Sequence, residues 1–196
     1  MKIEFEATFI DIDKDEIKNR LKKAGAVLTR PEFVQKRVTF NFPTGHENKN
    51  GWLRVRDEGD KITMIIKIID GKKIENQKEI GLTVDDFSEA VEMLETIGCR
   101  KKSYQETKRE IWILDDVEIM IDEWPFLEPL VEIEGKSEEA VKNVSEKLGF
   151  DYAQAFFGCV SPLYAKKYGV TEEFVNNHVA EIIFEGKNPF EKLFYE

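Results

Sequence analysis

The sequence predicts an α+β fold in which an antiparallel sheet, open or closed into a barrel, is flanked by helices. Stretches in which apolar and polar residues alternate outnumber the stretches with helical periodicity. Short polar turns, EGDK at 58–61 and DGKK at 70–73, join neighbouring strands as in antiparallel hairpins. The polar faces of several strands carry charged side chains, which is typical of a sheet whose two faces meet different surroundings.

The first half of the chain supplies most of the predicted strands. The first strand covers residues 2–10, and a helix follows over 10–26 with Asp13 as its N-cap and Gly25 as its stop. Alternation then predicts strands at 34–42, 51–58, 61–70 and 74–84.

The second half is predicted to mix helices and strands. A helix over 83–99 ends near Gly98, and a helix over 136–150 stops at Gly149. Strands are expected between these helices, at 106–114, 116–124 and 127–135.

The remaining residues form a C-terminal helical extension at about 169–196, with a helix candidate at 170–184. Its aromatic end, PFEKLFYE, is expected to pack on the barrel or on a second subunit, so a homodimer stays open. The linkers are too short to split the chain, which is read as one domain of residues 1–196.

Charge and composition limit the partners of this protein. The net charge is −10 and the pI about 5.0, which argues against binding duplex nucleic acid. No apolar run has membrane-spanning length, and no signal peptide is apparent. Cys99 and Cys159 lie far apart and suggest neither a disulfide framework nor a zinc site. We therefore expect a cytoplasmic protein without membrane or nucleic-acid partners.

Carboxylate pairs occur on the first and last predicted strands. Glu4 and Glu6 share one face of the first strand, and Glu132 and Glu134 share one face of the last. Residues two apart on a strand lie roughly 6.6 Å apart, which is too far for both to hold one ion without help. The spacing therefore favours one carboxylate from each of two neighbouring strands, or two ions side by side.

Basic side chains lie on the strands between these pairs. Arg54 and Arg56 share a strand face, Lys67 sits among apolar residues, and Arg109 belongs to a later strand. Oxygen ligands favour magnesium or manganese, and arginine binds phosphate with two parallel hydrogen bonds. Together they indicate phosphoryl chemistry on a polyphosphate. Taken singly, each pair is more often a cross-strand salt bridge on a solvent-exposed face.

The order of these motifs resembles the CYTH family, also called triphosphate tunnel metalloenzymes, over about residues 1–165. EFEAT matches two residues of the family's ExExK signature, and GWLRVRDEG is similar to its Arg-x-Arg strand. ITMIIK, TKREI, MIDEWPFLEPLVEIEG and SPLYAKKYG resemble further family segments in the same order.

The resemblance implies a closed antiparallel β-barrel, the triphosphate tunnel, with flanking helices and a charged lumen. It implies a metal, Mg²⁺ or Mn²⁺, and assigns roles to matching residues. The metal ligands would be Glu4, Glu6, Asp122, Glu132 and Glu134, with Glu79 as a supporting acid. The substrate-binding residues would be Arg54, Arg56, Lys67 and Arg109, and the catalytic residues Glu4, Glu6 and Lys67.

Two positions at which the resemblance implies a basic residue, a lysine at the first of them, carry threonine in this chain. Thr8 stands at the last position of the ExExK signature, and Thr107 stands two before Arg109. Arg37 shares the phase of Gln35 and Thr39, so Arg37 could restore the cation lost at Thr8 if its strand pairs with the first strand.

Three functions follow from this reading. The first is metal-dependent hydrolysis of an organic or inorganic triphosphate such as ATP, thiamine triphosphate or tripolyphosphate. The second is a class IV-type adenylyl cyclase that makes cyclic AMP from ATP. The third is a weakened module that binds phosphate or a nucleotide without turnover, which the change at Thr8 favours. A purely structural barrel, by contrast, would turn its charged faces to solvent and hold no polar cavity.

Overall fold

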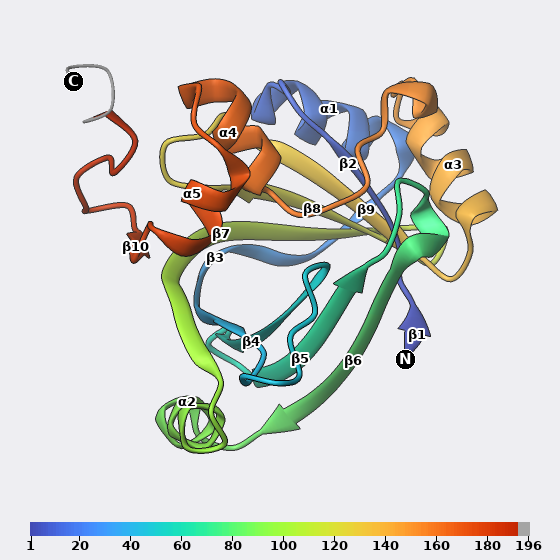
Figure 1. The fold of residues 1–196 in the computed structure, drawn as a ribbon. Coiled ribbons are helices and arrows are strands. Elements are labelled where there is room, and N and C mark those ends of the chain that lie inside the picture. The colour runs from blue at the N-terminus through green and yellow to red at the C-terminus, as the bar shows by residue number, and fades with distance from the viewer. Residues whose placement is uncertain (192–196) are drawn as a thin grey trace.

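The computed structural model describes residues 1–191, and the aromatic residues Phe194 and Tyr195 lie outside this range. One sheet contains the strands in the order β1-β6-β5-β4-β3-β7-β8-β9-β2, all antiparallel, and β10 joins β7 in parallel (Figure 1). The strands are β1 (Lys2–Ile3), β2 (Phe5–Phe9), β3 (Val27–Asn41), β4 (Gly51–Asp57), β5 (Ile62–Ile69), β6 (Gln77–Val84), β7 (Arg100–Leu114), β8 (Val117–Glu123), β9 (Leu130–Gly135) and β10 (Glu181–Ile182).

The first nine residues close the sheet into a barrel. β1 pairs with β6 and β2 pairs with β9, which are the two opposite ends of the strand order. Glu4 lies between the two short strands, and its backbone N–H donates to the carbonyl of Gln77 at 3.0 Å. The chain therefore bends once at Glu4 to reach both edges, and the predicted closed barrel is confirmed.

The flanking helices begin and end where local sequence signals place them. Asp13 accepts a hydrogen bond from the backbone of Glu16 at 2.8 Å, and Gly25 ends that helix with a φ of +82°. The helices are α1 (Lys14–Ala24), α2 (Phe87–Thr96), α3 (Glu138–Lys147), α4 (Ser161–Tyr168) and α5 (Glu172–Asn177), with 3₁₀ turns η1 (Ile74–Asn76) and η2 (Tyr152–Gln154).

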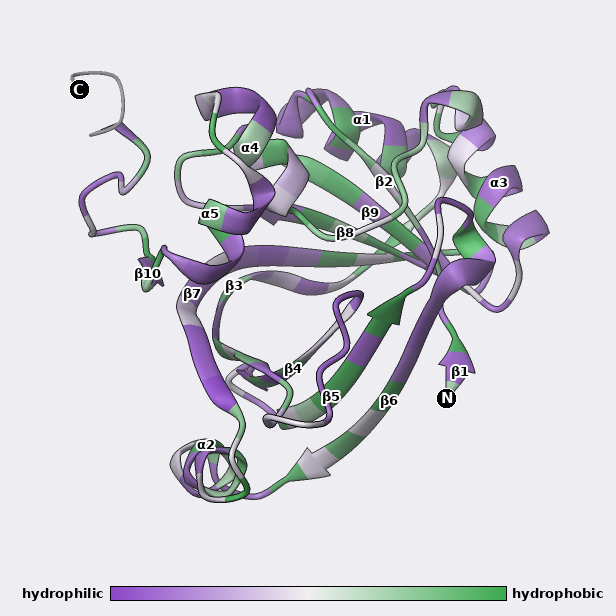
Figure 2. Cartoon of the chain, viewed as in Figure 1, coloured by the Kyte–Doolittle hydropathy of each residue, from purple (hydrophilic) through white to green (hydrophobic). Residues whose placement is uncertain are grey.

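Apolar residues of the strands face outward, where the helices cover them. α1 and α3 pack on β2, β8 and β9 through residues such as Ala7 and Ile133, and α2 packs on β3 and β4 through residues such as Val55. Hydrophobic and hydrophilic stretches follow one another along β5 and β9 in Figure 2. Because side chains alternate across a strand, the polar half of these residues turns into the barrel.

Two long strands begin earlier than the sequence indicated. β3 starts at Val27 rather than 34, and β7 starts at Arg100 rather than 106. The pairing of β3 with β7 shifts register on both sides of Pro31 and again after Thr39. These bulges break the regular alternation that a strand prediction relies on.

The helix predicted over 170–184 is wrong in its extent. α5 covers only Glu172–Asn177, and residues 181–182 form β10. The backbone N–H of Tyr104 donates to the carbonyl of Ala180 at 2.9 Å. Pairing with β7 thus overrides the local helical pattern. None of the helices in residues 1–191 has the length and hydropathy that a membrane crossing requires.

Candidate active site

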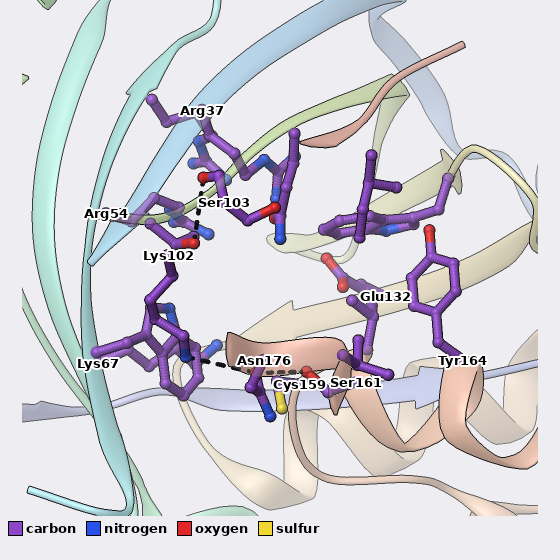
Figure 3. A pocket seen from close by; sticks show the side chains of 18 of the residues that line it. Arg37, Arg54, Lys67, Lys102, Ser103, Glu132, Cys159, Ser161, Tyr164 and Asn176 are labelled. Carbon is purple, nitrogen blue, oxygen red and sulfur yellow. Dashed lines mark hydrogen bonds between the residues drawn. The ribbon is translucent and has the colours of Figure 1, made fainter. Parts of the chain in front are cut away.

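A cavity of about 190 Å³ lies inside the barrel. It is lined by every candidate residue of the sequence analysis except Asp122. The acidic residues are Glu4, Glu6, Glu79, Glu132 and Glu134, and the basic ones are Arg37, Arg54, Arg56, Lys67, Lys102 and Arg109. Figure 3 shows Arg37, Arg54 and Lys67 along one wall and Glu132 and Tyr164 along the opposite wall. The charged faces therefore turn inward, against the purely structural reading of the strand pattern.

Three carboxylates converge at the point where the barrel closes. Glu4, Glu6 and Glu134 each place one oxygen within 4.8 Å of the others. Glu6 and Glu134 are directly opposite each other in the pairing of β2 with β9. Glu4 lies between β1 and β2, and its carboxylate still comes within reach of the same ion as that of Glu6.

Lys67 on β5 is the counter-ion of this group. Its Nζ lies 2.6 Å from Glu4 Oε2 and 3.2 Å from Glu6 Oε1. Burial disfavours the charge of Lys67, but the nearby carboxylates outweigh this effect and raise its pKa above the ordinary value. Lys67 is thus protonated at neutral pH and serves as a fixed positive charge.

One lysine does not neutralise three carboxylates. Burial, reinforced by neighbouring carboxylates, raises the pKa of Glu6 well above its ordinary value. Burial and the charge of Glu4 raise the pKa of Glu134 to about 7. Excess negative charge on oxygen ligands is the donor chemistry that Mg²⁺ and Mn²⁺ require, so Glu4, Glu6 and Glu134 fit such an ion.

Arg109 is held between two other carboxylates. In the pairing of β7 with β8 it stands opposite Asp122, and its Nε donates to Asp122 Oδ1 at 2.7 Å. Its Nη2 lies 2.5 Å from Glu132 Oε2. Asp122 is fully buried behind Arg109 and away from the cavity. Arg109 reaches the cavity as part of this ion group rather than as a free cation.

Arg37, which is buried, and Arg54, which is half-buried, are cations of a different kind. The Nε atom of each is buried without a hydrogen-bond partner among the described residues. Burial, together with the charge of Arg56, lowers the pKa of Arg54 to about 10, and burial with the charges of Arg54 and Arg56 lowers that of Arg37. The Arg37 guanidinium lies 4.6 Å from the ring of Trp124.

The pairing assumed for Arg37 is wrong. Its strand, β3, pairs with β4 and β7 and not with the first strand, because β7, β8 and β9 separate them in the sheet. Arg37 Nη2 donates to Thr107 Oγ1 and, at 2.9 Å, to Gln35 Oε1. Arg37 therefore stands beside the threonine at 107. Thr8 is buried, pairs with Phe156 through two backbone hydrogen bonds, and does not line the cavity.

Several cavity residues were not foreseen from the sequence. Lys102 comes from the irregular start of β7, and Ser161, Tyr164 and Asn176 come from α4 and α5. No spacing signal points to them, since they lie outside the alternating strand pattern. The segment SPLYAKKYG, which contains Ser161 and Tyr164, resembles a family segment, but the resemblance assigns no role to either residue.

Comparison with known proteins agrees with this architecture. The family model of the CYTH domain matches residues 2–155. A Vibrio parahaemolyticus protein described as a candidate adenylate cyclase superposes with a TM-score of 0.70 at 13% identity, over 84% of this chain and 98% of its own.

Two further solved structures share the fold. A Pyrococcus horikoshii protein gives a TM-score of 0.68 at 20% identity, over 84% of this chain and 99% of its own. A Hippeastrum protein gives 0.57 at 13% identity, over 86% and 97%, and is described as a candidate adenylyl cyclase with a dominant triphosphatase activity. Comparison with curated proteins gives no match.

Proposed function

The chain belongs to the CYTH domain family, and on this premise we propose that it hydrolyses a triphosphate with the help of a divalent cation. Proteins of this family bind triphosphate substrates and generally depend on a metal. The observation that carries the proposal is the arrangement of one cavity, in which three crowded carboxylates share the wall with Arg37 and Arg54, two cations whose Nε atoms have no hydrogen-bond partner among the described residues.

Glu4, Glu6 and Glu134 would hold the ion, Mg²⁺ or Mn²⁺. When bound, such an ion orients the phosphate oxygens and withdraws negative charge from them. Glu132, also on the cavity wall, and Asp122, behind it, hold the guanidinium of Arg109 toward the substrate. Glu79 lies across from Lys67 in the pairing of β5 with β6 and is a further acidic residue of the wall, beside Glu4 and Glu6.

The basic wall would bind the phosphate chain. Arg54, Arg56 and Lys67 extend from β4 and β5, and Arg37 from the neighbouring β3. A triphosphate would neutralise Arg37 and Arg54, which have no carboxylate partner within 4 Å among residues 1–191, and would remove the cost of desolvating them. Because Lys67 stays protonated, it stabilises negative charge in the transition state and does not act as a base.

The organic part of a substrate has room outside the barrel. A groove next to the cavity is lined by aromatic and amide side chains, and the two share Trp52, Lys102, Cys159 and Asn176. This favours an organic triphosphate over inorganic tripolyphosphate. It also keeps the cyclase function as a second candidate, in which the ribose 3′-hydroxyl of ATP replaces water as the attacking group.

Product analysis separates the candidates. The protein is incubated with Mg²⁺ or Mn²⁺ and with ATP, thiamine triphosphate or tripolyphosphate. Free phosphate supports the hydrolase, whereas cyclic AMP with pyrophosphate supports the cyclase. Metal-dependent thermal stabilisation without product supports the third candidate, a module that only binds.

Two variants link the result to the cavity. Glu6→Gln removes a buried carboxylate of the cluster and is expected to abolish turnover, whereas Glu92→Gln on the exposed face of α2 leaves it unchanged. Turnover that survives in Glu6→Gln, or no stabilisation of the wild type by any of these compounds, would contradict the proposal.

A further inference from the structure

The six cations of the cavity wall fall into two groups. Three lie within 4 Å of a carboxylate: Lys67 with Glu4 and Glu6, Arg109 with Asp122 and Glu132, and Arg56 with Glu58. The other three, Arg37, Arg54 and Lys102, form no ion pair with any carboxylate in residues 1–191. Arg37 is buried, and Arg54 and Lys102 are half-buried. A cation that has lost part of its hydration and has no nearby anion is costly, so this second group marks where an anion can bind.

Lys102 reaches the cavity through a β-bulge. Thr39 pairs with Ser103 and Phe40 pairs with Lys101, which leaves Lys102 as the extra residue of β7. A bulge turns a side chain away from the face that strict alternation would give it. Lys102 consequently lines the cavity together with Ser103, its neighbour on the regular inward face (Figure 3).

The C-terminal segment, residues 156–191, holds Lys102 in this position. Lys102 Nζ donates to Asn176 Oδ1 at 3.4 Å, and Ser161 Oγ donates to the same oxygen at 2.9 Å. Asn176 therefore joins β7 to α4 and α5 with its carbonyl oxygen. Its amide nitrogen is not used by either contact and can donate to an anion in the cavity.

The segment that supplies Asn176 and Ser161 is firmly packed. β10 pairs with β7 next to the bulge, at Tyr104 and Gln105. Phe190 is fully buried and stacks on Tyr164 and Tyr168 with ring centroids 4.8 and 5.0 Å apart. The match to the CYTH domain ends at residue 155, so α4, α5 and β10, which make these contacts with β7, lie outside the matched residues.

We propose that Lys102, Ser161 and Asn176 form a phosphate-binding subsite at one end of the cavity. The subsite rests on the proposed triphosphate function and deepens it by adding a cation and two uncharged donors at the end of the cavity that α4 and α5 cover. Lys102 stands beside Arg37 and Arg54 as a further cation of the cavity wall that has no carboxylate partner in the described part of the chain. Lys102 contacts a phosphoryl oxygen directly, and Asn176 positions Lys102 while donating its own N–H to the same group.

The test is calorimetric titration of tripolyphosphate, with Mg²⁺ present and absent, against matched variants. Lys102→Gln removes the charge, Lys102→Arg keeps it, and Lys101→Gln removes an exposed neighbouring charge. We expect Lys102→Gln to weaken binding by roughly tenfold to a hundredfold, the loss that follows removal of a charged hydrogen bond. Lys102→Arg should recover most of the affinity, and Lys101→Gln should change it less than about twofold, as for an exposed charge.

Asn176→Ala reaches the subsite from the C-terminal segment and covers the case in which Lys102→Gln does not fold. Asn176→Ala is expected to weaken tripolyphosphate binding. Because this variant removes no charge, it should reduce the salt dependence of the affinity less than Lys102→Gln does. Wild-type binding that neither variant weakens would overturn the subsite and leave the proposed function standing. A wild type that binds neither tripolyphosphate nor an organic triphosphate such as ATP or thiamine triphosphate would instead overturn the proposed function.

Discussion

Replacing Arg54 by methionine is expected to stabilise the ligand-free protein and to abolish its stabilisation by tripolyphosphate. Burial and the nearby charge of Arg56 lower the pKa of Arg54 from 12.5 to about 10. A tenfold change in a dissociation constant is worth about 1.4 kcal/mol, so carrying this charge costs the folded state about 3 kcal/mol.

Proton linkage gives the direction of this stability effect and the pH range in which it acts. The folded protein binds this proton more weakly than the unfolded chain, so the cost is present in full below pH 10 and disappears only as the pH rises toward 12.5. At pH 7 the variant should therefore gain stability. We expect about 1–3 kcal/mol, because solvent that enters the cavity screens part of the charge.

Thermal unfolding with and without tripolyphosphate measures both effects. For a chain of this length, 1 kcal/mol shifts the midpoint by about 2–4 °C. The matched control is Arg56→Met on the same strand, since Arg56 Nη2 lies 2.6 Å from Glu58 Oε1 and Glu58 is only 3% exposed. Removing Arg56 leaves that carboxylate buried without this partner and should lower the midpoint.

Either of two results would contradict this prediction. If Arg54→Met lowers the midpoint as much as Arg56→Met does, Arg54 is a structural ion-pair residue and not an unpaired cation. If Arg54→Met is stabilised by tripolyphosphate as strongly as the wild type, the phosphate chain binds elsewhere.

Three further outcomes are expected. Mn²⁺ should bind more tightly as the pH rises from 6 to 8, because Glu134, whose pKa is raised to about 7, must lose its proton to become a ligand. Titration calorimetry should show that the Mn²⁺ affinity of Glu134→Gln depends less on pH. Tripolyphosphate should slow the alkylation of Cys159 on the cavity wall, while buried Cys99 stays unreactive in the folded protein; equal rates with and without ligand would place the anion outside the cavity. Phe190→Ala should cost about 3–5 kcal/mol of unfolding free energy, measured with denaturant, through lost stacking on Tyr164; a loss below 1 kcal/mol would show that the C-terminal segment packs loosely.

The two-residue period of a strand predicted which charged side chains share a face, and the family resemblance predicted that these faces line the lumen of a barrel. Glu4, Glu6, Arg54, Arg56 and Lys67 keep that period, and all of them line the cavity. The barrel itself followed from the order of these motifs and their family likeness, which the match over residues 2–155 confirms. The roles assigned to the individual residues stay predictions for the experiments above.

The sequence did not show which side chains contact one another. Nothing in the motif order showed that Arg109 stands opposite Asp122 in the hairpin of β7 and β8, or that Arg37 meets Thr107. Register decides such contacts, and register depends on where bulges fall in both strands.

The sequence by itself determined which face of each regular strand is charged and which ligand class that charge fits, because alternation and residue chemistry are local properties. The tertiary structure decided how the charges divide between paired and unpaired groups. The bend at Glu4 gathers Glu4, Glu6 and Glu134, and the bulge in β7 turns Lys102 into the cavity beside Asn176. Both depend on hydrogen bonds between segments far apart in the chain, which no local pattern encodes.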